Sequence, residues 1–224
     1  MKGPMSGWTS VCSATFAFVA LAGWSPGKGL STEALYWTAA ENSPFFAIRR
    51  SRLDGSNIED VLSGVENQLG ELAVDAQAGK LYWVENGVSV HRMVRSGLDG
   101  REQEVLLTTA DVLLRIALDV PDDAIYFTAS VIGGGAGIRR MSLGGGDVKE
   151  VIAAEAGDLA VDSAAGRIYW VQEGAIGTYG TDIWSAALDG SGPERVVHPP
   201  SSTIRPASPS IQRAARSTGP RSTT

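Results

Sequence analysis

Three short patterns repeat in one phase along this chain, and their spacing restricts the fold more than any other feature of the sequence. Aromatic pairs recur at steps of 46, 44 and 43 residues, as Tyr36-Trp37, Tyr82-Trp83, Tyr126-Phe127 and Tyr169-Trp170. Glycine turns recur at steps of 45, as Leu53-Asp54-Gly55, Leu98-Asp99-Gly100, Leu143-Gly144-Gly145 and Leu188-Asp189-Gly190. Apolar runs end at Asp75, Asp119 and Asp162, each seven residues before its aromatic pair. A period in the mid-forties indicates stacked units with the length of four-stranded propeller blades.

Each repeat contains four short apolar runs, which in the second repeat cover residues 69–75, 81–84, 93–98 and 103–107. No useful stretch has the 3.6-residue period of a helix. The dipeptide Asp99-Gly100 between two runs predicts a two-residue type I′ hairpin, in which both central residues have positive φ. The sequence therefore predicts an all-β propeller of four-stranded antiparallel blades over residues 23–199.

These patterns resemble the YWTD repeat of the low-density lipoprotein receptor class B family. One repeat contains Asp75, Gly79-Lys80-Leu81-Tyr82-Trp83 and Leu98-Asp99-Gly100; another contains Asp162, Gly166-Arg167-Ile168-Tyr169-Trp170 and Leu188-Asp189-Gly190-Ser191. The resemblance covers about residues 35–197 and implies a six-bladed β-propeller that recognises proteins outside the cell without catalysis. This chain has four repeats, and the final aspartate of the signature is replaced in each, by Ala39, Glu85, Ala129 and Gln172.

Composition limits the function classes. The net charge is −6, and residues 200–224 contain four arginines and no acid, so the rest carries 15 basic and 25 acidic groups. An acidic body argues against nucleic-acid binding, which needs a basic face. The Ser-, Thr- and Pro-rich segment 200–224 is predicted to be disordered. Cys12 is the only cysteine, so no intrachain disulfide is expected.

The N-terminal segment has features of a signal peptide. Lys2 precedes an uncharged stretch whose apolar centre, residues 11–22, is too short to span a membrane. Ala20-Leu21-Ala22 provides small residues for cleavage, which predicts a removed segment 1–22 and a secreted chain. The alternatives are that residues 16–21 form a strand of the first blade and that the protein is cytoplasmic.

Recognition is predicted on the loops after the second and fourth strands of each blade, because variable loops on a rigid scaffold commonly bind partners. The loops after the second strands vary most, and they are predicted at residues 39–47, 85–92, 129–137 and 172–182. The predicted protein-binding residues there are Phe45, Phe46, Glu85, His91, Glu173 and Tyr179. The alternative for both phenylalanines is a place in the core of the first blade.

One residue column carries repeated charge. Two residues after Ile48, Met93, Ile138 and Ile183 come Arg50, Arg95, Arg140 and Ser185. A ring of arginines could bind a ligand, but a residue repeated in every unit usually serves the unit itself. We expect each arginine to pack its stem on an aromatic ring and to bond backbone or carboxylate oxygens.

Catalytic chemistry has little support in the sequence. His91 and His198 lack neighbours at metal-ligand spacing, and the glycine-rich segment 133–137 precedes no helix that could bind an anion. The rival interpretation is a gluconolactonase-like hydrolase with a divalent cation in the central channel. Glu71, Arg115 and Asp158 would line that channel, where an arginine between two acids predicts ion pairing instead. We therefore predict no enzyme activity, no metal and no cofactor.

Four repeats are too few for the six-bladed ring that the resemblance implies. Because each blade packs on its neighbours, an incomplete ring leaves an apolar face at both ends. We therefore expect an open arc, which is part of a longer propeller or self-associates through its end blades. A closed four-bladed ring is the rival.

Overall fold

Sixteen strands form the folded part of the chain. The structure, a computed structural model, describes residues 19–20, 34–41, 45–130, 135–172 and 182–197, and these contain no helix. The strands make four antiparallel sheets of four strands, each in sequence order. The first two sheets, blades 1 and 2, consist of β1 (Val19–Ala20), β2 (Ala34–Ala40), β3 (Phe46–Arg52), β4 (Glu59–Val65), β5 (Gln68–Asp75), β6 (Lys80–Asn86), β7 (His91–Gly97) and β8 (Glu104–Thr109). Blades 3 and 4 consist of β9 (Val112–Asp119), β10 (Ala124–Ser130), β11 (Ala136–Met141), β12 (Lys149–Ile152), β13 (Ala156–Asp162), β14 (Arg167–Gln172), β15 (Asp182–Ala187) and β16 (Glu194–Val197).

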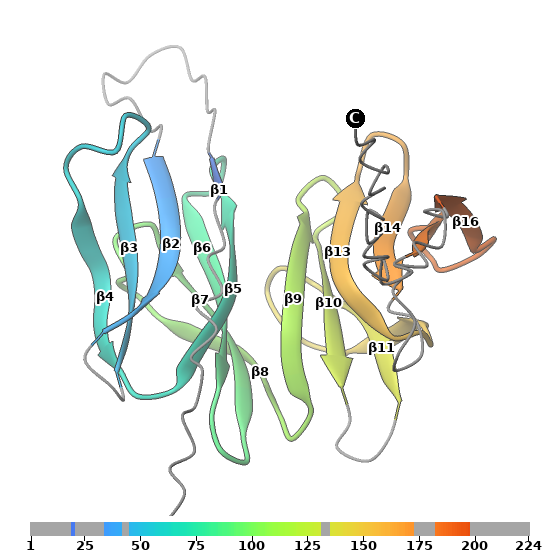
Figure 1. Cartoon of the computed structure of the whole chain (residues 1–224), viewed down its shortest axis with the longest axis horizontal. Helices are drawn as coiled ribbons and strands as arrows, with labels where there is room; N and C mark the ends of the chain where they lie inside the picture. The colour runs from blue at the N-terminus through green and yellow to red at the C-terminus, as the bar shows by residue number, and fades with distance from the viewer. Residues whose placement is uncertain (1–18, 21–33, 42–44, 131–134, 173–181, 198–224) are drawn as a thin grey trace, which may run out of the picture.

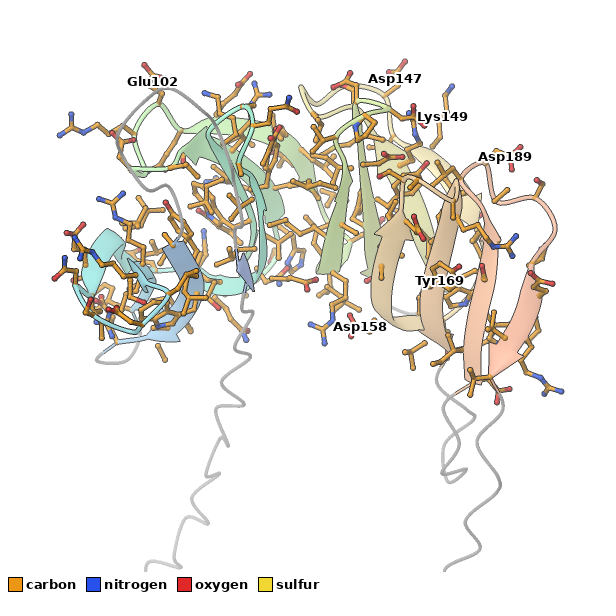
Figure 2. The ribbon with its side chains drawn as sticks, turned by 90° about the horizontal axis from the view of Figure 1, so that it is seen from above. Glu102, Asp147, Lys149, Asp158, Tyr169 and Asp189 are labelled. Carbon is orange, nitrogen blue, oxygen red and sulfur yellow. The ribbon has the colours of Figure 1, made fainter. Side chains whose placement is uncertain are left out.

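The four blades follow one another in an arc, with blades 1 and 4 at its two ends (Figures 1 and 2). Inner strands of neighbouring blades pack side by side, β5 on β9 and β9 on β13. Figure 2 labels Glu102, Asp147 and Lys149 along the outer edge and Asp158 on the opposite, inner edge. The predicted all-β blade architecture is confirmed, and the described part of the chain does not form a closed four-bladed ring.

The first blade receives its inner strand from the apolar N-terminal segment. Val19 pairs with Tyr36 and Ala20 pairs with Leu35 in antiparallel register. This pairing agrees with the alternative that residues 16–21 contribute a strand. Cleavage after Ala22 would remove that strand and leave blade 1 with three.

The hydrophobic core consists of three clusters, and each lies between two consecutive blades. We call the surface that a blade turns toward the next blade its forward face, and the opposite surface its backward face. Between blades 1 and 2, for example, Tyr36 and Ile48 on a forward face meet Leu72 and Trp83 on a backward face. The three clusters bury Ile48, Met93 and Ile138 completely, so the 45-residue column predicted from sequence is a column of inter-blade contacts. Burying each such side chain contributes about 2 kcal/mol.

The glycine turns differ from the predicted type I′ hairpins. Gly100 has φ 76°, but Asp99 is absent from the described residues with positive φ. Gly97 N donates to Arg101 O at 2.9 Å, and Gly100 N donates to Gly97 O at 2.9 Å. These bonds enclose a three-residue loop with a left-handed glycine at its end, the arrangement of a type I turn followed by a bulge. The two-residue prediction was wrong because Leu98 belongs to the loop and not to the strand.

Each glycine turn is seated on the outer strand of the preceding blade. A Cβ atom added at Gly100, Gly145 or Gly190 would lie 2.5, 3.0 or 2.2 Å from a backbone oxygen of the preceding blade, that of Val61, Leu106 or Val151 respectively. Glycine is therefore needed there both for its left-handed conformation and for the close approach of backbone. At Gly55, in blade 1, nothing lies within 4 Å of the same added atom.

A polar contact joins the same parts of neighbouring blades. Tyr36 Oη donates to Leu98 O at 3.4 Å, and Tyr126 Oη donates to Leu188 O at 3.0 Å, each pair 62 residues apart. Between blades 2 and 3 the donor is Arg95, whose Nη1 lies 3.0 Å from Leu143 O. In blades 1 and 3 the hydroxyl of the signature tyrosine thus connects its blade to the leucine of the next glycine turn, and in blade 2 Arg95 makes the equivalent contact.

Five of the six repeated aspartates serve the turns within blades, whereas Asp119 is buried and has no hydrogen-bond partner among the described residues. Asp75 Oδ1 accepts hydrogen bonds from Gln77 N and Ala78 N, both at 2.9 Å. Asp162 accepts one from Ala165 N at 2.9 Å, and the glycine-turn residues Asp54, Asp99 and Asp189 accept from backbone N–H groups two residues later. These side chains close local turns, as short acidic residues commonly do.

The arginine column has the predicted structural role. Arg50 pairs with Glu59 and Arg95 with Glu104, while the Arg140 guanidinium lies 6.0 Å from the centroid of the Tyr126 ring. Blade 4 has Ser185 in this column. There Arg167 reaches across, with Nε donating to Ser185 Oγ at 2.7 Å and Nη2 bonding Glu194. In blade 4 an arginine of the second strand thus pairs with the acid of the fourth strand.

Candidate functional site

The described connections after the second and fourth strands lie on one face, along the lower edge in Figure 1, which we call the loop face. Strands extend further than predicted, so the connections after the second strands shorten to residues 41–45, 87–90, 131–135 and 173–181. Of these, only 87–90 is described in full. The 87–90 connection lies on the predicted face, and the predicted lengths of these connections were too long.

The 87–90 hairpin presents apolar side chains to solvent. Gly87 N donates to Val90 O at 3.1 Å, which closes the hairpin. Val88 is 102% exposed and Val90 is 46% exposed. A Cβ at Gly87 would approach Val90 O to 2.7 Å, so only glycine permits this tight closure. Exposed β-branched side chains on a fixed hairpin form a ready contact surface for a partner.

The base of this hairpin is held by one amide side chain. Asn86 Nδ2 donates to Leu113 O at 2.9 Å, and Asn86 Oδ1 accepts from Leu113 N at 3.3 Å, across the boundary with blade 3. His91 Nδ1 lies 2.9 Å from the same Oδ1 atom. A half-buried amide with donor and acceptor both used holds the hairpin in one orientation.

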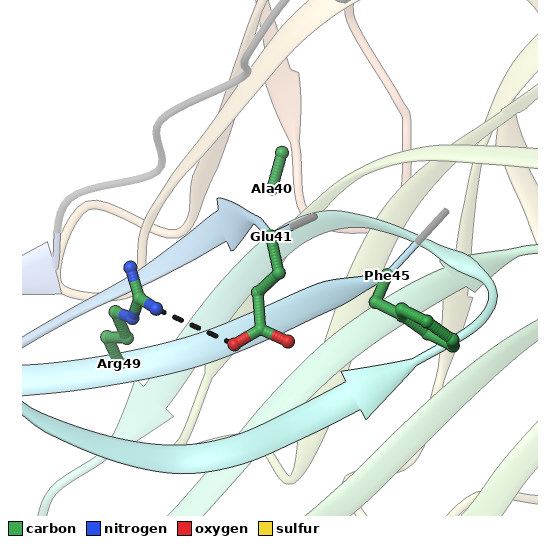
Figure 3. A pocket seen from close by; sticks show the side chains of 4 residues that line it. All are labelled: Ala40, Glu41, Phe45 and Arg49. Carbon is green, nitrogen blue, oxygen red and sulfur yellow. Dashed lines mark ion pairs between the residues drawn. The ribbon is translucent and has the colours of Figure 1, made fainter. Parts of the chain in front are cut away.

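A depression of about 460 Å³ lies on blade 1 at the same face, and its described lining residues are Ala40, Glu41, Phe45 and Arg49 (Figure 3). Glu41 Oε1 is 3.5 Å from Arg49 Nη2, and its Oε2 accepts a hydrogen bond from Gly64 N at 3.1 Å. Phe45 is 39% exposed beside this pair. An aromatic edge next to a half-exposed ion pair suits a mixed apolar and polar contact.

The predicted binding residues separate into three groups. Phe45 is on the loop face, whereas Phe46 begins β3 and packs partly buried against the core between blades 1 and 2. The prediction that Glu85 and His91 lie in loops was wrong, because they occupy β6 and β7. Glu85 accepts bonds from Trp83 and Asn67, and His91 is buried. Glu173 and Tyr179 lie outside the described residues. Val88 and Val90 lie in the predicted loop 85–92 but were not among the predicted binding residues, because the sequence alone does not show that their side chains are exposed.

On the inner edge of the arc, the predicted trio is held by internal contacts. Arg115 Nε lies 3.5 Å from Asp158 Oδ1, and Glu71 Oε2 accepts a hydrogen bond from Ile116 N at 2.9 Å. The predicted ion pairing is thus confirmed for Asp158. The described residues contain no group of three or more His, Cys, Asp or Glu side chains placed to hold a metal ion. A guanidinium within the trio opposes cation binding, because it repels a second positive charge.

Glu71 supplies a pH-dependent test of this arrangement. Burial raises the pKa of its carboxyl, and Asp158 adds to this, while the Ile116 N–H and Arg115 oppose it. Because the folded chain then holds the proton more tightly than the unfolded chain, stability is greatest below the unfolded pKa of about 4.3 and falls as pH rises through the folded pKa. Glu71→Gln keeps an acceptor for Ile116 N and removes this fall.

The measurement is the urea midpoint of unfolding across about pH 4 to 7. The parent chain is expected to lose more stability over this range than Glu71→Gln. Glu155→Gln, at an exposed position, is the matched control and should keep the parent slope. Equal slopes for all three proteins would show that Glu71 is not desolvated.

Comparisons with known proteins agree with the repeat pattern. Mouse low-density lipoprotein receptor-related protein 5 is 33% identical to this chain over 94 residues, which are 42% of this chain and 6% of that protein. A crystal structure of a nidogen/laminin complex has TM-score 0.60 at 16% identity, over 72% of this chain and 59% of that one. Oligogalacturonate lyase in complex with manganese has TM-score 0.57 at 13% identity, over 74% and 50%. No family model matches.

Consecutive four-stranded blades with cores between them define a β-propeller type of protein, and the solved structures support that fold. Within this class, the sequence match confirms the resemblance to the YWTD-repeat propellers of the lipoprotein receptor family. This chain spans less than two thirds of the length of each of these three proteins. Since a lyase shares the fold, the fold does not separate binding from catalysis.

None of the described residues forms a helix of the length and apolar character that crossing a bilayer requires.

Proposed function

We propose that this chain is a non-catalytic module that binds protein partners outside the cell through its loop face. The observation that carries the proposal is the fully exposed Val88 at the tip of a hairpin with a fixed base. Val90 and Phe45 add exposed apolar surface on the same face, next to the Glu41–Arg49 pair. Interfaces commonly combine such apolar centres with a polar rim.

Two comparisons support the same function. The sequence match is to a lipoprotein receptor-related protein, and one structural match is a nidogen in complex with laminin. Both support the proposal that this chain recognises a protein and is located outside the cell, which is also what secretion of the chain would require. The hydrolase alternative gains no support from the inner edge, where Arg115 neutralises Asp158 and Glu71 bonds backbone.

The test uses the immobilised full chain and a displayed library of extracellular protein fragments. Fragments that bind should lose on the order of tenfold or more in affinity for a Val88→Asp, Val90→Asp double variant, because a charge replaces a desolvated contact. The matched control is Val148→Asp, at an exposed valine in the β11–β12 connection on the opposite face. Binding that is equally insensitive to both changes would place recognition elsewhere, and no enrichment over an unrelated protein would contradict a binding module.

A further inference from the structure

The two ends of the arc present the two halves of one contact. The forward faces of blades 1, 2 and 3 each receive the glycine turn of the next blade. The contact residues in one blade lie 45 residues from the equivalent residues in the next. The forward half consists of a signature tyrosine, an apolar residue of the third strand and an outer-strand carbonyl. The backward half consists of the Leu-Asp-Gly turn.

Among the described residues, none occupies the forward half on blade 4. Its third-strand residue Ile183 is half-buried, although Ile48, Met93 and Ile138 in the same column are completely buried. Ile183 and Tyr169 line a depression of about 120 Å³ together with Asp158, Leu159, Ala160, Trp170 and Val171. Val196, which corresponds to the seat residues Val61, Leu106 and Val151, is 52% exposed.

The backward half on blade 1 is likewise not occupied by any described residue. Leu53 is 46% exposed, whereas Leu143 in the same column is 9% exposed. Gly55 has φ 77°, like Gly100 at 76°, and Ser56 N donates to Asp54 Oδ1 at 2.9 Å, as the corresponding N–H groups do to Asp99 and Asp189 in the turns of blades 2 and 4. The turn on blade 1 is therefore already in the conformation that the three seated turns adopt, with open space above its glycine.

We propose that a second copy of this chain seats its Leu53-Asp54-Gly55 turn on the forward face of blade 4, so that copies associate head to tail. In this contact Tyr169 Oη donates to Leu53 O of the other copy, and Gly55 approaches Val196 O. We infer a second copy of this chain as the partner of the forward face of blade 4 because the complementary turn is present on blade 1 of the same molecule. The contact would also repeat an interface that occurs three times between consecutive blades. Such a heterologous contact can repeat from copy to copy. It forms a closed ring if the rotation between successive copies adds up to a full turn, and an open filament if it does not.

Sedimentation velocity of the full chain, reduced to keep Cys12 as a thiol, over a dilution series tests this directly. The average mass should rise with concentration. Gly55→Ala should weaken association on the order of tenfold or more, since a Cβ there meets the seat carbonyl only in the assembly. Gly79→Ala is the matched control, because Gly79 also has positive φ, 65°, and open space, but lies in the β5–β6 turn away from both end faces.

Changes on the other half complete the design. Ile183→Glu should weaken association as strongly as Gly55→Ala, and Tyr169→Phe should weaken it less. A mixture of Gly55→Ala and Ile183→Glu should stop at a dimer, because each copy keeps one working half. An effect of Ile183→Glu without an effect of Gly55→Ala would indicate a tail-to-tail contact and overturn the proposal. A monomer at every concentration, or equal behaviour of Gly55→Ala and Gly79→Ala, would overturn it as well.

Discussion

Trp83→Ala is expected to lower the free energy of unfolding by about 3–5 kcal/mol, the cost typical of removing a large aromatic side chain from a packed core. Trp83 has no exposed surface and lies in the cluster between blades 1 and 2. Its Nε1 donates to Glu85 Oε1 at 3.1 Å, so the substitution also removes a hydrogen bond. Both losses fall on the contact that joins two blades.

Urea unfolding followed by far-ultraviolet circular dichroism measures this loss without relying on tryptophan fluorescence. Trp37→Ala provides the comparison, because Trp37 holds the same position in blade 1 and is only half-buried at the end of the arc. Its effect should be less than half as large. Equal losses for the two variants would mean that the inter-blade cluster is not what stabilises Trp83.

Gly190→Ala is expected to cost about 2–5 kcal/mol, from a left-handed backbone of about 1–2 and overpacking of about 1–3. Gly190 has φ 85°, and its added Cβ would lie 2.2 Å from Val151 O, a backbone atom of blade 3 that has little freedom to move. Because the turn is the contact between blades 3 and 4, the variant should also loosen blade 4 from the rest.

Gly166→Ala separates the two contributions to this loss. Gly166 has φ 65° and nothing within 4 Å of an added Cβ, so only the backbone strain of about 1–2 kcal/mol should appear. The difference between the two variants then measures the seat on Val151. Identical losses would show that blade 3 yields at no cost and that the turn is not tightly seated.

The repeats allowed most of the fold to be predicted because their spacing reports a contact that every blade makes. Ile48, Met93 and Ile138 stand 45 residues apart since each fills the same position against the next blade. The arginine column could be interpreted for the same reason. The sequence was less informative where one repeat differs from the others. Blade 4 has Ser185 in place of the column arginine, and nothing in the order of residues indicated that Arg167 would take that arginine's role.

The candidate site was harder to predict, because it depends on differences among repeats. The loop was predicted to begin at Asp99, but it begins one residue earlier, at Leu98. This difference changed the hairpin from the expected two-residue type to a three-residue type. His91 looked available as an isolated polar residue, yet it pairs with Asn86, whose amide also bonds Leu113 in the next blade. Contacts between units of this kind have no local signal. The exposure of Val88 likewise depends on how far β6 and β7 extend.

The open arc is tested most directly by distances between spin labels at one equivalent position per blade. Cysteines would replace Ile58, Gln103, Val148 or Pro193, which are exposed and 45 residues apart, in a chain with Cys12 replaced by serine. Labelled pairs diluted in unlabelled protein report distances within one copy. The arc predicts that the 58–193 distance exceeds the 58–148 distance, which exceeds the 58–103 distance. A 58–193 distance equal to the 58–103 distance would mean that blades 1 and 4 are neighbours in a closed ring, and the open arc would be wrong.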